Sequence, residues 1–312
     1  MAGRFPVTSS FHDHVADYLA ARRALGFKLE YPGVLLAQFA SYLEVAGATT
    51  VTVELAVAFA GRPKGVTPLH LAHRLGALRG FARYLKTIEP ATEVPPHGIW
   101  PTRQDRPAPY IWAEEDIARL VDAAGALQPR LKALTLGTLF GLLASSGLRV
   151  GEALALAGDD VDLASGVLTV RNAKFDRERY VPLHPTTTEA LRRYAKERDA
   201  LVAGPPKGFF VLGTRGPLGY NSVQPAFRDL TTALGLRTAE TRPRIHDLRH
   251  SFVVRVLLAW HRAGLDISRR LAFLSNYLGH TSIEGTYWYF SAVPELMEIA
   301  MSYTDGHPGV PR

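Results

Sequence analysis

The sequence predicts a mainly α-helical protein with a small antiparallel β-sheet, divided into two domains by a proline-rich segment. Most of the chain carries apolar residues at helical spacing, whereas residues 167–171 and 179–183 alternate as strands do. Six prolines fall between residues 90 and 109, where they disfavour a helix and indicate an extended connection. A length of 312 residues also exceeds what one typical hydrophobic core requires.

The proline-rich segment sets the expected domain boundaries. We expect a helical first domain over residues 1–92, a linker over 93–109 and a second domain over 110–312. Helices of the first domain are expected over residues 11–25, 34–46, 52–60 and 68–87. Thr52 can cap the third of these helices, because a threonine hydroxyl accepts a hydrogen bond from an amide of the first turn.

The fourth expected helix has an apolar face and a basic face. Arg79, Arg83 and Lys86 line the basic face. Arginine and lysine make many of the contacts that proteins form with a sugar-phosphate backbone, so we expect these three residues to bind nucleic acid. A solvated outer face is the alternative.

The second domain is expected to combine helices with a hairpin. The acidic residues 114–116 suit the positive end of a helix dipole, so a helix is expected to start there. Strands over 167–171 and 179–183 are joined by the polar residues 172–178, as in a hairpin. Further helices are expected over residues 131–146, 185–203, 222–234, 247–263, 266–278 and 293–302.

Charge and composition restrict the classes of partner and location. The chain carries 36 Lys and Arg against 29 Asp and Glu, a net charge of +7. This excess favours a polyanionic partner, although a merely basic enzyme fits the same numbers. The absence of cysteine excludes disulfides and thiolate metal sites and fits a reducing cytoplasm. The longest uncharged apolar stretch, residues 133–148, is shorter than the roughly 20 residues of a membrane span, so we expect no membrane segment.

Two arginines stand in contexts that suit phosphate binding. Arg149 follows a Gly-Leu turn at the end of an apolar helix, and Glu152 lies three residues on, on the same side of the next helix. A guanidinium with a buried stem presents a fork to two phosphate oxygens. A surface pair of Arg149 with Glu152 is the alternative. Arg249 lies three residues after His246, so both side chains face one site.

The histidines allow a metal site to be weighed against a phosphate site. His246 and His250 are four residues apart on one helix, but zinc sites of this kind add a glutamate and a third ligand. Arg249 between them would repel a cation, so we expect no metal. His280 ends a helix in the sequence Leu-Gly-His, and Tyr289 lies nine residues further on in an aromatic run that alone is typical of a core.

Lys174 lies in the loop of the expected hairpin, where a lysine is normally just solvated. Such a loop can also bring an ammonium group into a cleft, where it donates a proton to a leaving oxygen. A buried cluster of two arginines, two histidines and a tyrosine suits few tasks other than handling a phosphate. Phosphodiester chemistry on nucleic acid is therefore the leading hypothesis.

The order Arg, Lys, His-x-x-Arg, His, Tyr resembles the tyrosine recombinase (phage-type integrase) family over nearly the whole second domain. The segments that carry the resemblance are Gly147-Leu-Arg-Val-Gly-Glu-Ala-Leu154, Lys174-Phe-Asp-Arg-Glu-Arg-Tyr-Val-Pro-Leu183, Ile245-His-Asp-Leu-Arg-His-Ser-Phe252 and Tyr277-Leu-Gly-His-Thr281, the last continuing to Tyr289. The helical first domain looks like the core-binding domain of the family.

The resemblance implies a role for each charged residue. It makes Arg149 and Arg249 the arginines that clamp the phosphate. It makes Lys174 the acid that protonates the leaving 5′ oxygen. Glu152 matches an acidic position that orients the site.

The resemblance also implies roles for the remaining residues of the cluster. His246 would take or relay the proton of the tyrosine, and His280 would donate a hydrogen bond to a non-bridging oxygen. The spacing in the family makes Tyr289 the nucleophile, with Tyr287 as the alternative.

The implied reaction is strand exchange through a 3′-phosphotyrosyl intermediate, without ATP, metal or other cofactor. The implied partner is double-stranded DNA with inverted half-sites, bound by a homotetramer at the nucleoid of a prokaryote and serving a phage or other mobile element. The amphipathic residues 293–300 would dock on a neighbouring subunit or on their own domain. A type IB topoisomerase and a DNA-binding protein without catalysis are the alternative functions.

Overall fold

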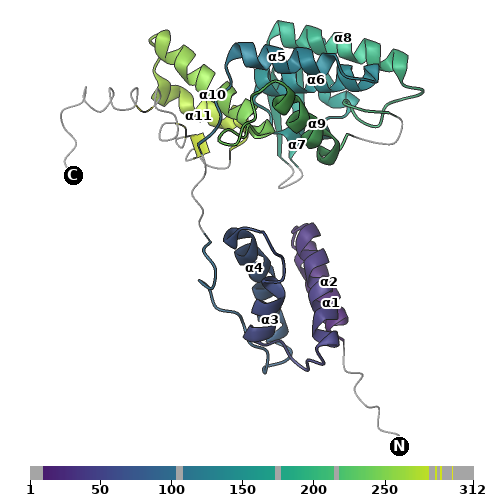
Figure 1. Cartoon of the computed structure of the whole chain (residues 1–312), viewed down its shortest axis with the longest axis vertical. Coiled ribbons are helices and arrows are strands. Elements are labelled where there is room, and N and C mark those ends of the chain that lie inside the picture. The colour runs from purple at the N-terminus through teal and green to yellow at the C-terminus, as the bar shows by residue number, and fades with distance from the viewer. Residues whose placement is uncertain are drawn as a thin grey trace, which may run out of the picture. The chain divides into compact units, whose positions relative to one another are not determined.

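The computed structural model describes residues 10–102, 108–172, 177–213, 218–280, 285–286, 289 and 297. These residues are mainly helical and include a small three-stranded antiparallel sheet, as the sequence predicts (Figure 1). The chain divides into two compact units, a first unit of Met1–Arg106 and a second unit of Pro107–Arg312.

The first unit is built from four helices: α1 (Phe11–Ala24), α2 (Glu30–Val45), α3 (Val53–Ala60) and α4 (Pro68–Leu85). Three of them begin next to a side chain that accepts a hydrogen bond from an amide of the first turn, namely Ser10, Thr52 and Thr67. The prediction that Thr52 caps the third helix is therefore confirmed.

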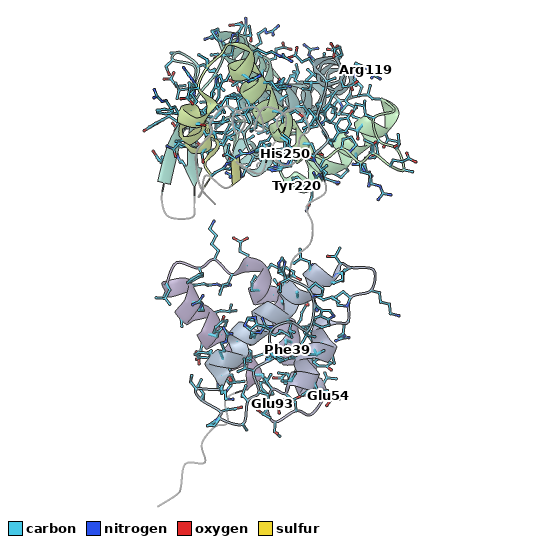
Figure 2. All side chains as sticks on the ribbon, turned by 90° about the vertical axis from the view of Figure 1, so that its left-hand side faces the viewer. Phe39, Glu54, Glu93, Arg119, Tyr220 and His250 are labelled. Atoms are coloured by element: carbon cyan, nitrogen blue, oxygen red, sulfur yellow. The ribbon has the colours of Figure 1, made fainter. Side chains whose placement is uncertain are left out.

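The four helices enclose an apolar core. Leu36, Phe39, Leu78 and Phe81 have no exposed surface, and Phe39 lies in the interior of this unit (Figure 2). The rings of Phe39 and Phe59 are 5.1 Å apart between centroids. Burial of such large apolar side chains is the main stabilising contribution to a small helical unit.

Helix α2 begins four residues before the start that the apolar pattern predicts. Leu29, the residue before the helix, adopts a positive φ of 46° and turns the chain into it. Pro32 lies in the first turn, where a proline is tolerated because the amides there have no partner within the helix. The pattern of apolar residues starts only at Val34, so it misses this first turn.

Two arginines of α4 hold part of the proline-rich segment against that helix. Arg79 donates from Nε to the carbonyl of Pro95 and from Nη2 to that of Pro96, each at 2.7 Å. Nη2 of Arg83 lies 3.2 Å from Nε2 of His97. Two of the three residues expected to bind nucleic acid therefore have a structural role that helical spacing does not reveal.

The helices of the second unit are α5 (Glu114–Gly125), α6 (Arg130–Ser146), α7 (Val150–Ala155), α8 (Pro185–Leu201), α9 (Tyr220–Ala233), α10 (Ile245–Arg262) and α11 (Ile267–Leu278). Those predicted helices of this unit that fall on described residues are confirmed to within a few residues at each end. One apolar cluster, which includes Trp112, Phe140, Phe210 and Phe227, forms most of the core of this unit. Within the unit, α5, α6 and α8 lie side by side on one side and α7 on the other (Figure 1).

The sheet has the strand order β1 (Val161–Asp162), β2 (Val167–Asn172), β3 (Arg177–Pro182), with antiparallel neighbours. The predicted hairpin is β2 and β3, whereas β1 has only two residues and was missed because so short a strand shows no alternation. Leu168 pairs with Val181 and Val170 pairs with Arg179. These three apolar side chains are buried, so Arg179 extends from the face of the sheet that meets the core.

Helix α10 is held by hydrogen bonds to two other segments of the unit. Arg255 donates from Nη2 to the carbonyl of Ala144 near the end of α6, at 2.6 Å. The hydroxyl of Ser251 accepts a hydrogen bond from the backbone amide of Trp112, at 2.8 Å. Arg249, in the first turns of α10, donates to the carbonyl of Gly147, so the start of α10 and the end of α6 lie together.

Three expected features lie outside the described residues: Lys174 in the loop of the hairpin, Tyr287 as the alternative nucleophile, and, apart from Met297, the expected helix over 293–302. Within the part of the chain that is described, no helix has the length and apolar character needed to cross a membrane.

Substitution of Phe39 by alanine tests the core of the first unit. Removing a fully buried ring leaves a cavity, so we expect the free energy of unfolding of this unit to fall by about 3–5 kcal/mol. Val45→Ala is the control, because Val45 is 90% exposed; we expect it to change the free energy by less than about 0.5 kcal/mol. Urea unfolding of the full chain, followed by circular dichroism, measures both. Equal effects of the two substitutions would contradict the assigned core.

Candidate active site

Five chain segments of the second unit converge on one cluster of polar side chains. Arg149 precedes α7, Arg179 lies on β3, and Arg249 lies in the first turns of α10. His280 follows α11, and Tyr289 lies nine residues beyond it. The carbonyl oxygens of residues 147 and 277–279 accept hydrogen bonds from the three arginines.

Gly147 allows the chain to turn from α6 into α7. It ends α6 in the left-handed conformation, with a φ of 64°. A Cβ atom at this position would lie 2.4 Å from Cδ1 of Phe252 on α10. Any other residue would therefore be strained and would push α10 away, which explains the glycine before Arg149 in the sequence.

Arg149 stands at the cap position of α7 and is only partly engaged. Its Nη1 donates to Oε1 of Glu152 at 2.7 Å, and its Nη2 donates to the carbonyl of Gly279 at 3.1 Å. Its side chain is 38% exposed. The expected pair with Glu152 is present, and the guanidinium still presents an open side to a ligand.

Glu152 is held by two arginines at once. Its Oε1 accepts from Arg149 and, at 3.0 Å, from Nη1 of Arg179. Its Oε2 accepts from the amide of Arg149 at 2.9 Å and from Nη2 of Arg179 at 2.7 Å. Burial alone would raise the pKa of this carboxyl, but the hydrogen bonds and charges of the two arginines outweigh it and lower the pKa to about 2.

Arg249 is the most deeply buried arginine of the cluster, with 2% of its surface exposed. Nη1 donates to the carbonyl of Gly147 at 2.7 Å and Nη2 to that of Leu278 at 2.8 Å. Burial, followed by the charge of Arg149, lowers the pKa of Arg249 to about 10. The group therefore keeps its positive charge at neutral pH.

Two histidines of the cluster, His246 and His280, have pKa values below the ordinary value, so their rings are mainly neutral at neutral pH. Burial lowers the pKa of His246, and Arg249 lowers it further. Burial and the neighbouring arginines Arg249 and Arg149 lower the pKa of His280 to about 4. Nδ1 of His280 lies 2.8 Å from the hydroxyl of Thr286, a side chain with no exposed surface. If that hydroxyl donates, the proton of the ring is on Nε2, which can then donate to a ligand.

Tyr289 is buried within the same unit, with 2% of its surface exposed, and packs on the apolar side chains of α10 and α11. Its hydroxyl lies 2.9 Å from Nδ1 of His250 (His250 is labelled in Figure 2). The negative charge of an ionised Tyr289 would raise the pKa of Arg249, so the phenol lies within electrostatic reach of the arginine cluster. From the sequence we expected His246 to take the proton of this tyrosine. The structure instead places His250, one helical turn further on, against the hydroxyl, with the ring of His246 at 4.6 Å from that of His250.

The arrangement is suited to a phosphodiester. Arg149, Arg179 and Arg249 oppose the single carboxylate of Glu152, so these four groups carry an excess of two positive charges. Guanidinium groups fixed by the backbone stabilise an anion without first having to reorganise. Beside them lie a hydroxyl that can act as a nucleophile and histidines that can donate or accept a proton.

The expected residues do not all belong to this cluster. Arg149, Glu152, His246, Arg249, His280 and Tyr289 come together, whereas Lys174 lies outside the described residues. Arg79, Arg83 and Lys86 lie in the first unit, on α4 and directly after it.

Three members of the cluster are not predicted from the sequence. Arg179 lies in a segment that carries the resemblance, and a charged residue two positions before the buried Val181 of a strand indicates an inward-facing charge. For His250 the sequence suggests only a metal ligand. Thr286 carries no signal in the sequence, because its contact with His280 depends on the folded structure. Among the described residues, no group of three or more His, Cys, Asp or Glu side chains is placed to hold a metal ion.

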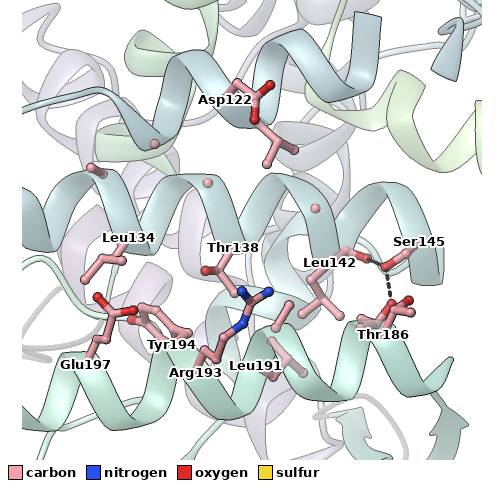
Figure 3. Close-up of a pocket in the computed structure, with 17 residues that line it drawn as sticks. Asp122, Leu134, Thr138, Leu142, Ser145, Thr186, Leu191, Arg193, Tyr194 and Glu197 are labelled. Carbon is pink, nitrogen blue, oxygen red and sulfur yellow. Dashed lines mark hydrogen bonds between the residues drawn. The ribbon is translucent and has the colours of Figure 1, made fainter. Parts of the chain in front are cut away.

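A hollow of about 630 Å³ lies elsewhere in the second unit, between α5, α6 and α8. Figure 3 shows Arg193, Tyr194 and Glu197 of α8 opposite Leu134 and Thr138 of α6. No residue of the polar cluster lines this hollow. We therefore base the function on the cluster.

Comparison with known proteins agrees with the geometry. The sequence model of the phage integrase family matches residues 112–295. The protein y4rB of Sinorhizobium fredii, which is named among integrases and recombinases, is 42% identical over 304 residues, which cover 94% of this chain and 96% of that protein. Tyrosine recombinase XerD of Brucella suis is 31% identical over 255 residues and covers 78% of each chain.

Solved structures show the same fold. The XerH site-specific recombinase, bound to its palindromic difH substrate, aligns over 95% of this chain and 85% of its own with a TM-score of 0.65 and 20% identity. The Tn1549 transposon integrase in complex with transposon right end DNA aligns over 93% of this chain with a TM-score of 0.64 and 16% identity. The chain belongs to the phage integrase family, the tyrosine recombinases, which are enzymes that cleave and rejoin DNA strands.

The low pKa of Glu152 predicts a specific loss of stability in acid. A carboxyl whose folded-state pKa is depressed stabilises the fold above its unfolded-state value, and this contribution disappears as the pH falls through the folded-state value. We expect the free energy of unfolding of the wild type to fall more steeply than that of Glu152→Gln between about pH 4.3 and pH 2. Urea unfolding at a series of pH values tests this difference; parallel curves for the two proteins would contradict it.

The environment of His280 predicts that its ring titrates in acid. In the protein alone we expect an NMR titration of His280, assigned with His280→Asn, to give a pKa well below 6.5 and near 4. Binding of a DNA duplex should raise that pKa, because the phosphate brings negative charge to the arginines that depress it. A pKa at or above 6.5 in the free protein would contradict the burial of this ring among the arginines.

Proposed function

We propose that this chain is a site-specific DNA recombinase that cleaves and rejoins strands through a covalent bond between Tyr289 and a 3′-phosphate. The observation that carries the proposal is the meeting of a buried tyrosine hydroxyl with a cluster of arginines in one unit of one chain. The DNA-bound state of the XerH and Tn1549 proteins supports double-stranded DNA as the substrate.

The two arginines of the expected motif hold the scissile phosphate. Arg149 approaches from α7 with a partly exposed guanidinium, and Arg249 approaches from α10 with a buried one. A phosphodiester carries one negative charge, and its pentacoordinate transition state gains a second. The excess of two positive charges at the cluster therefore matches the transition state better than the ground state, which is the condition for catalysis.

The hydroxyl of Tyr289 attacks the phosphorus atom and displaces the 5′ oxygen of the next nucleotide. The P–O bond to the tyrosine forms as the P–O bond to that oxygen breaks, so the bond energy is retained and no ATP is needed. Lys174 donates a proton to the leaving oxygen, which departs as a 5′-hydroxyl. Rejoining is the reverse of this step on the same or another strand.

The proton of the tyrosine leaves during the attack, because a phenol with an ordinary pKa of about 10 is mostly protonated at neutral pH. Nδ1 of His250, at 2.9 Å from the hydroxyl, is the nearest described group that can accept it. His246, whose ring packs against that of His250, lies closer to the phosphate and, like His280, donates a hydrogen bond to a non-bridging oxygen.

We further propose that recombination takes place between inverted half-sites bound by a homotetramer at the nucleoid, as part of a mobile element or phage. Residues 1–92, the expected first domain, bind the duplex beside the cleavage site, and residues 93–109 link them to the second domain. Within the first domain, Lys86 and Arg83 are exposed, whereas the guanidinium of Arg79 is engaged by Pro95 and Pro96. We therefore assign the stronger phosphate contacts to Lys86 and Arg83.

Substitution of Tyr289 by phenylalanine tests the nucleophile. A duplex site is first selected by the protein from a random library, and a nick beside the scissile phosphate then traps the covalent product. We expect Tyr289→Phe to form no covalent protein–DNA adduct while its affinity for the duplex stays within about threefold of the wild type. The ring that packs on α10 and α11 is retained, so the fold is unaffected.

Tyr287→Phe is the matched control, because it removes a hydroxyl from the same aromatic run. We expect this variant to form adducts as the wild type does. Adducts with Tyr289→Phe, or their loss with Tyr287→Phe alone, would overturn the assignment. Relaxation of supercoiled plasmid by the protein in the absence of any selected site would indicate a topoisomerase instead.

A further inference from the structure

Arg179 connects its own strand, β3, to two helices of the cluster. Nε donates to the carbonyl of Tyr277 at the end of α11, at 3.0 Å. Nη1 and Nη2 donate to the two carboxylate oxygens of Glu152 on α7, at 3.0 and 2.7 Å. All three nitrogens of the guanidinium thus donate within the protein, and the side chain is 16% exposed against 38% for that of Arg149, which favours a role in supporting the site over direct contact with a ligand.

The pair of Arg179 with Glu152 differs from the surface ion pairs of this chain. Each of the two side chains is 16% exposed, and the two parallel hydrogen bonds form the bidentate geometry in which arginine and carboxylate interact most strongly. By contrast, Arg192 pairs with Glu189 on α8, where the side chains are 50% and 54% exposed. Exposed pairs of this kind contribute little to stability and fix little geometry.

Glu152 transmits the position of Arg179 to Arg149. Its Oε1 accepts from Nη1 of Arg149 and from Nη1 of Arg179, and its Oε2 accepts from the amide of Arg149 and from Nη2 of Arg179. With Arg179 in place the carboxylate cannot rotate without breaking two charged hydrogen bonds. Without Arg179 it would be held by Arg149 alone, and the two groups would be free to turn together.

Arg179 also packs against the turn that leads to His280. Gly279 ends α11 with a φ of 65°, and a Cβ atom there would lie 2.7 Å from Nη1 of Arg179. The carbonyl of the same glycine accepts from Nη2 of Arg149. The glycine before His280 therefore serves a contact with Arg179 as well as the left-handed turn.

We propose that Arg179 is a positioning residue of the phosphate site: through Glu152 it orients Arg149, and through the carbonyl of Tyr277 it fixes the turn that carries His280. This inference rests on the proposed function, in which Arg149 clamps the scissile phosphate. It adds a third arginine to the two of the expected motif, with a role in geometry and not in direct contact with DNA.

The test compares single-turnover cleavage of the nicked, selected duplex by the wild type and by Arg179 variants of the full chain. A misplacement of about 1 Å in a catalytic group can cost on the order of 100-fold in rate, so we expect Arg179→Ala to cleave about 10- to 100-fold more slowly. Its affinity for the duplex should stay within about threefold, because Arg179 makes no contact with DNA. Arg179→Lys keeps the charge but cannot bridge both oxygens of Glu152, so its cleavage rate should lie between that of the wild type and that of Arg179→Ala.

Two further measurements separate positioning from general damage to the fold. Methylguanidinium should restore part of the rate of Arg179→Ala, whereas methylammonium should not. In a protein that already carries Glu152→Gln, the addition of Arg179→Ala should lower the cleavage rate by less than about threefold, because the two residues act through one contact. Arg192→Ala, which removes an arginine from an exposed carboxylate pair on α8, is the control and should cleave at the wild-type rate.

Each outcome bears on a different claim. If the wild type forms no adduct at Tyr289, the proposed function fails and the role of Arg179 with it. If the wild type forms the adduct and both Arg179→Ala and Arg179→Lys cleave at its rate, the role of Arg179 is overturned while the proposed function stands. The same holds if the losses from Arg179→Ala and Glu152→Gln simply multiply. If Arg179→Ala does not fold, the cleavage rates of Arg179→Lys alone and of Arg179→Lys combined with Glu152→Gln test the role of Arg179 in the same way.

Discussion

The arrangement of the site depends on the carboxylate of Glu152. A negative charge in a site for an anion cancels one positive charge and so weakens the attraction for the ligand. Within the protein the carboxylate is favourable, because it offsets the repulsion among Arg149, Arg179 and Arg249 and holds two of them by hydrogen bonds. A carboxylate shared between two of them lets all three stay close together, and an excess of positive charge still faces the ligand. The pair of Glu152 with Arg179 connects α7 to β3, and Arg179 also donates to the carbonyl of Tyr277 near the end of α11.

Burial lowers the pKa values of Arg249 and His280 in the cluster, but only the arginine remains charged at neutral pH. Arg249 keeps its charge in spite of burial, since even a pKa lowered to about 10 lies far above neutral. His280 loses its charge under the same conditions, with a pKa of about 4. The charge that meets a phosphate therefore comes from the arginines, whereas the histidines supply hydrogen bonds and proton transfer. A neutral ring is directional and its tautomer is set by one neighbour, which for His280 is Thr286.

The sequence predicted those parts of the fold and site that depend on local patterns. Helical periodicity located the described helices, and the order of Arg149, His246, Arg249, His280 and Tyr289 identified the residues that come together. Contacts between distant segments could not be predicted in this way. The pairing of Arg179 with Glu152 spans 27 residues, and the contact of His250 with Tyr289 spans 39. Both depend on how α7, β3, α10 and the chain after α11 pack, which periodicity does not specify.

In the first unit, too, a contact between separate segments was not predicted from the sequence. The basic face of α4 was correctly placed on a helix, but spacing on one helix does not reveal what covers that face. The carbonyls of Pro95 and Pro96 engage Arg79 because the chain after α4 folds back along it. An arginine at a helix surface thus has two kinds of partner, a phosphate or a backbone carbonyl, and the second becomes visible only in three dimensions.

Mass spectrometry of the trapped covalent complex identifies the residue that attacks the DNA. After digestion of the protein and the DNA, we expect a peptide that contains Tyr289 and carries a nucleotide through its 3′-phosphate, with a 5′-hydroxyl on the released strand. A linkage to Tyr287 or to another residue, or a bond to a 5′-phosphate, would show that Tyr289 is not the nucleophile of this reaction.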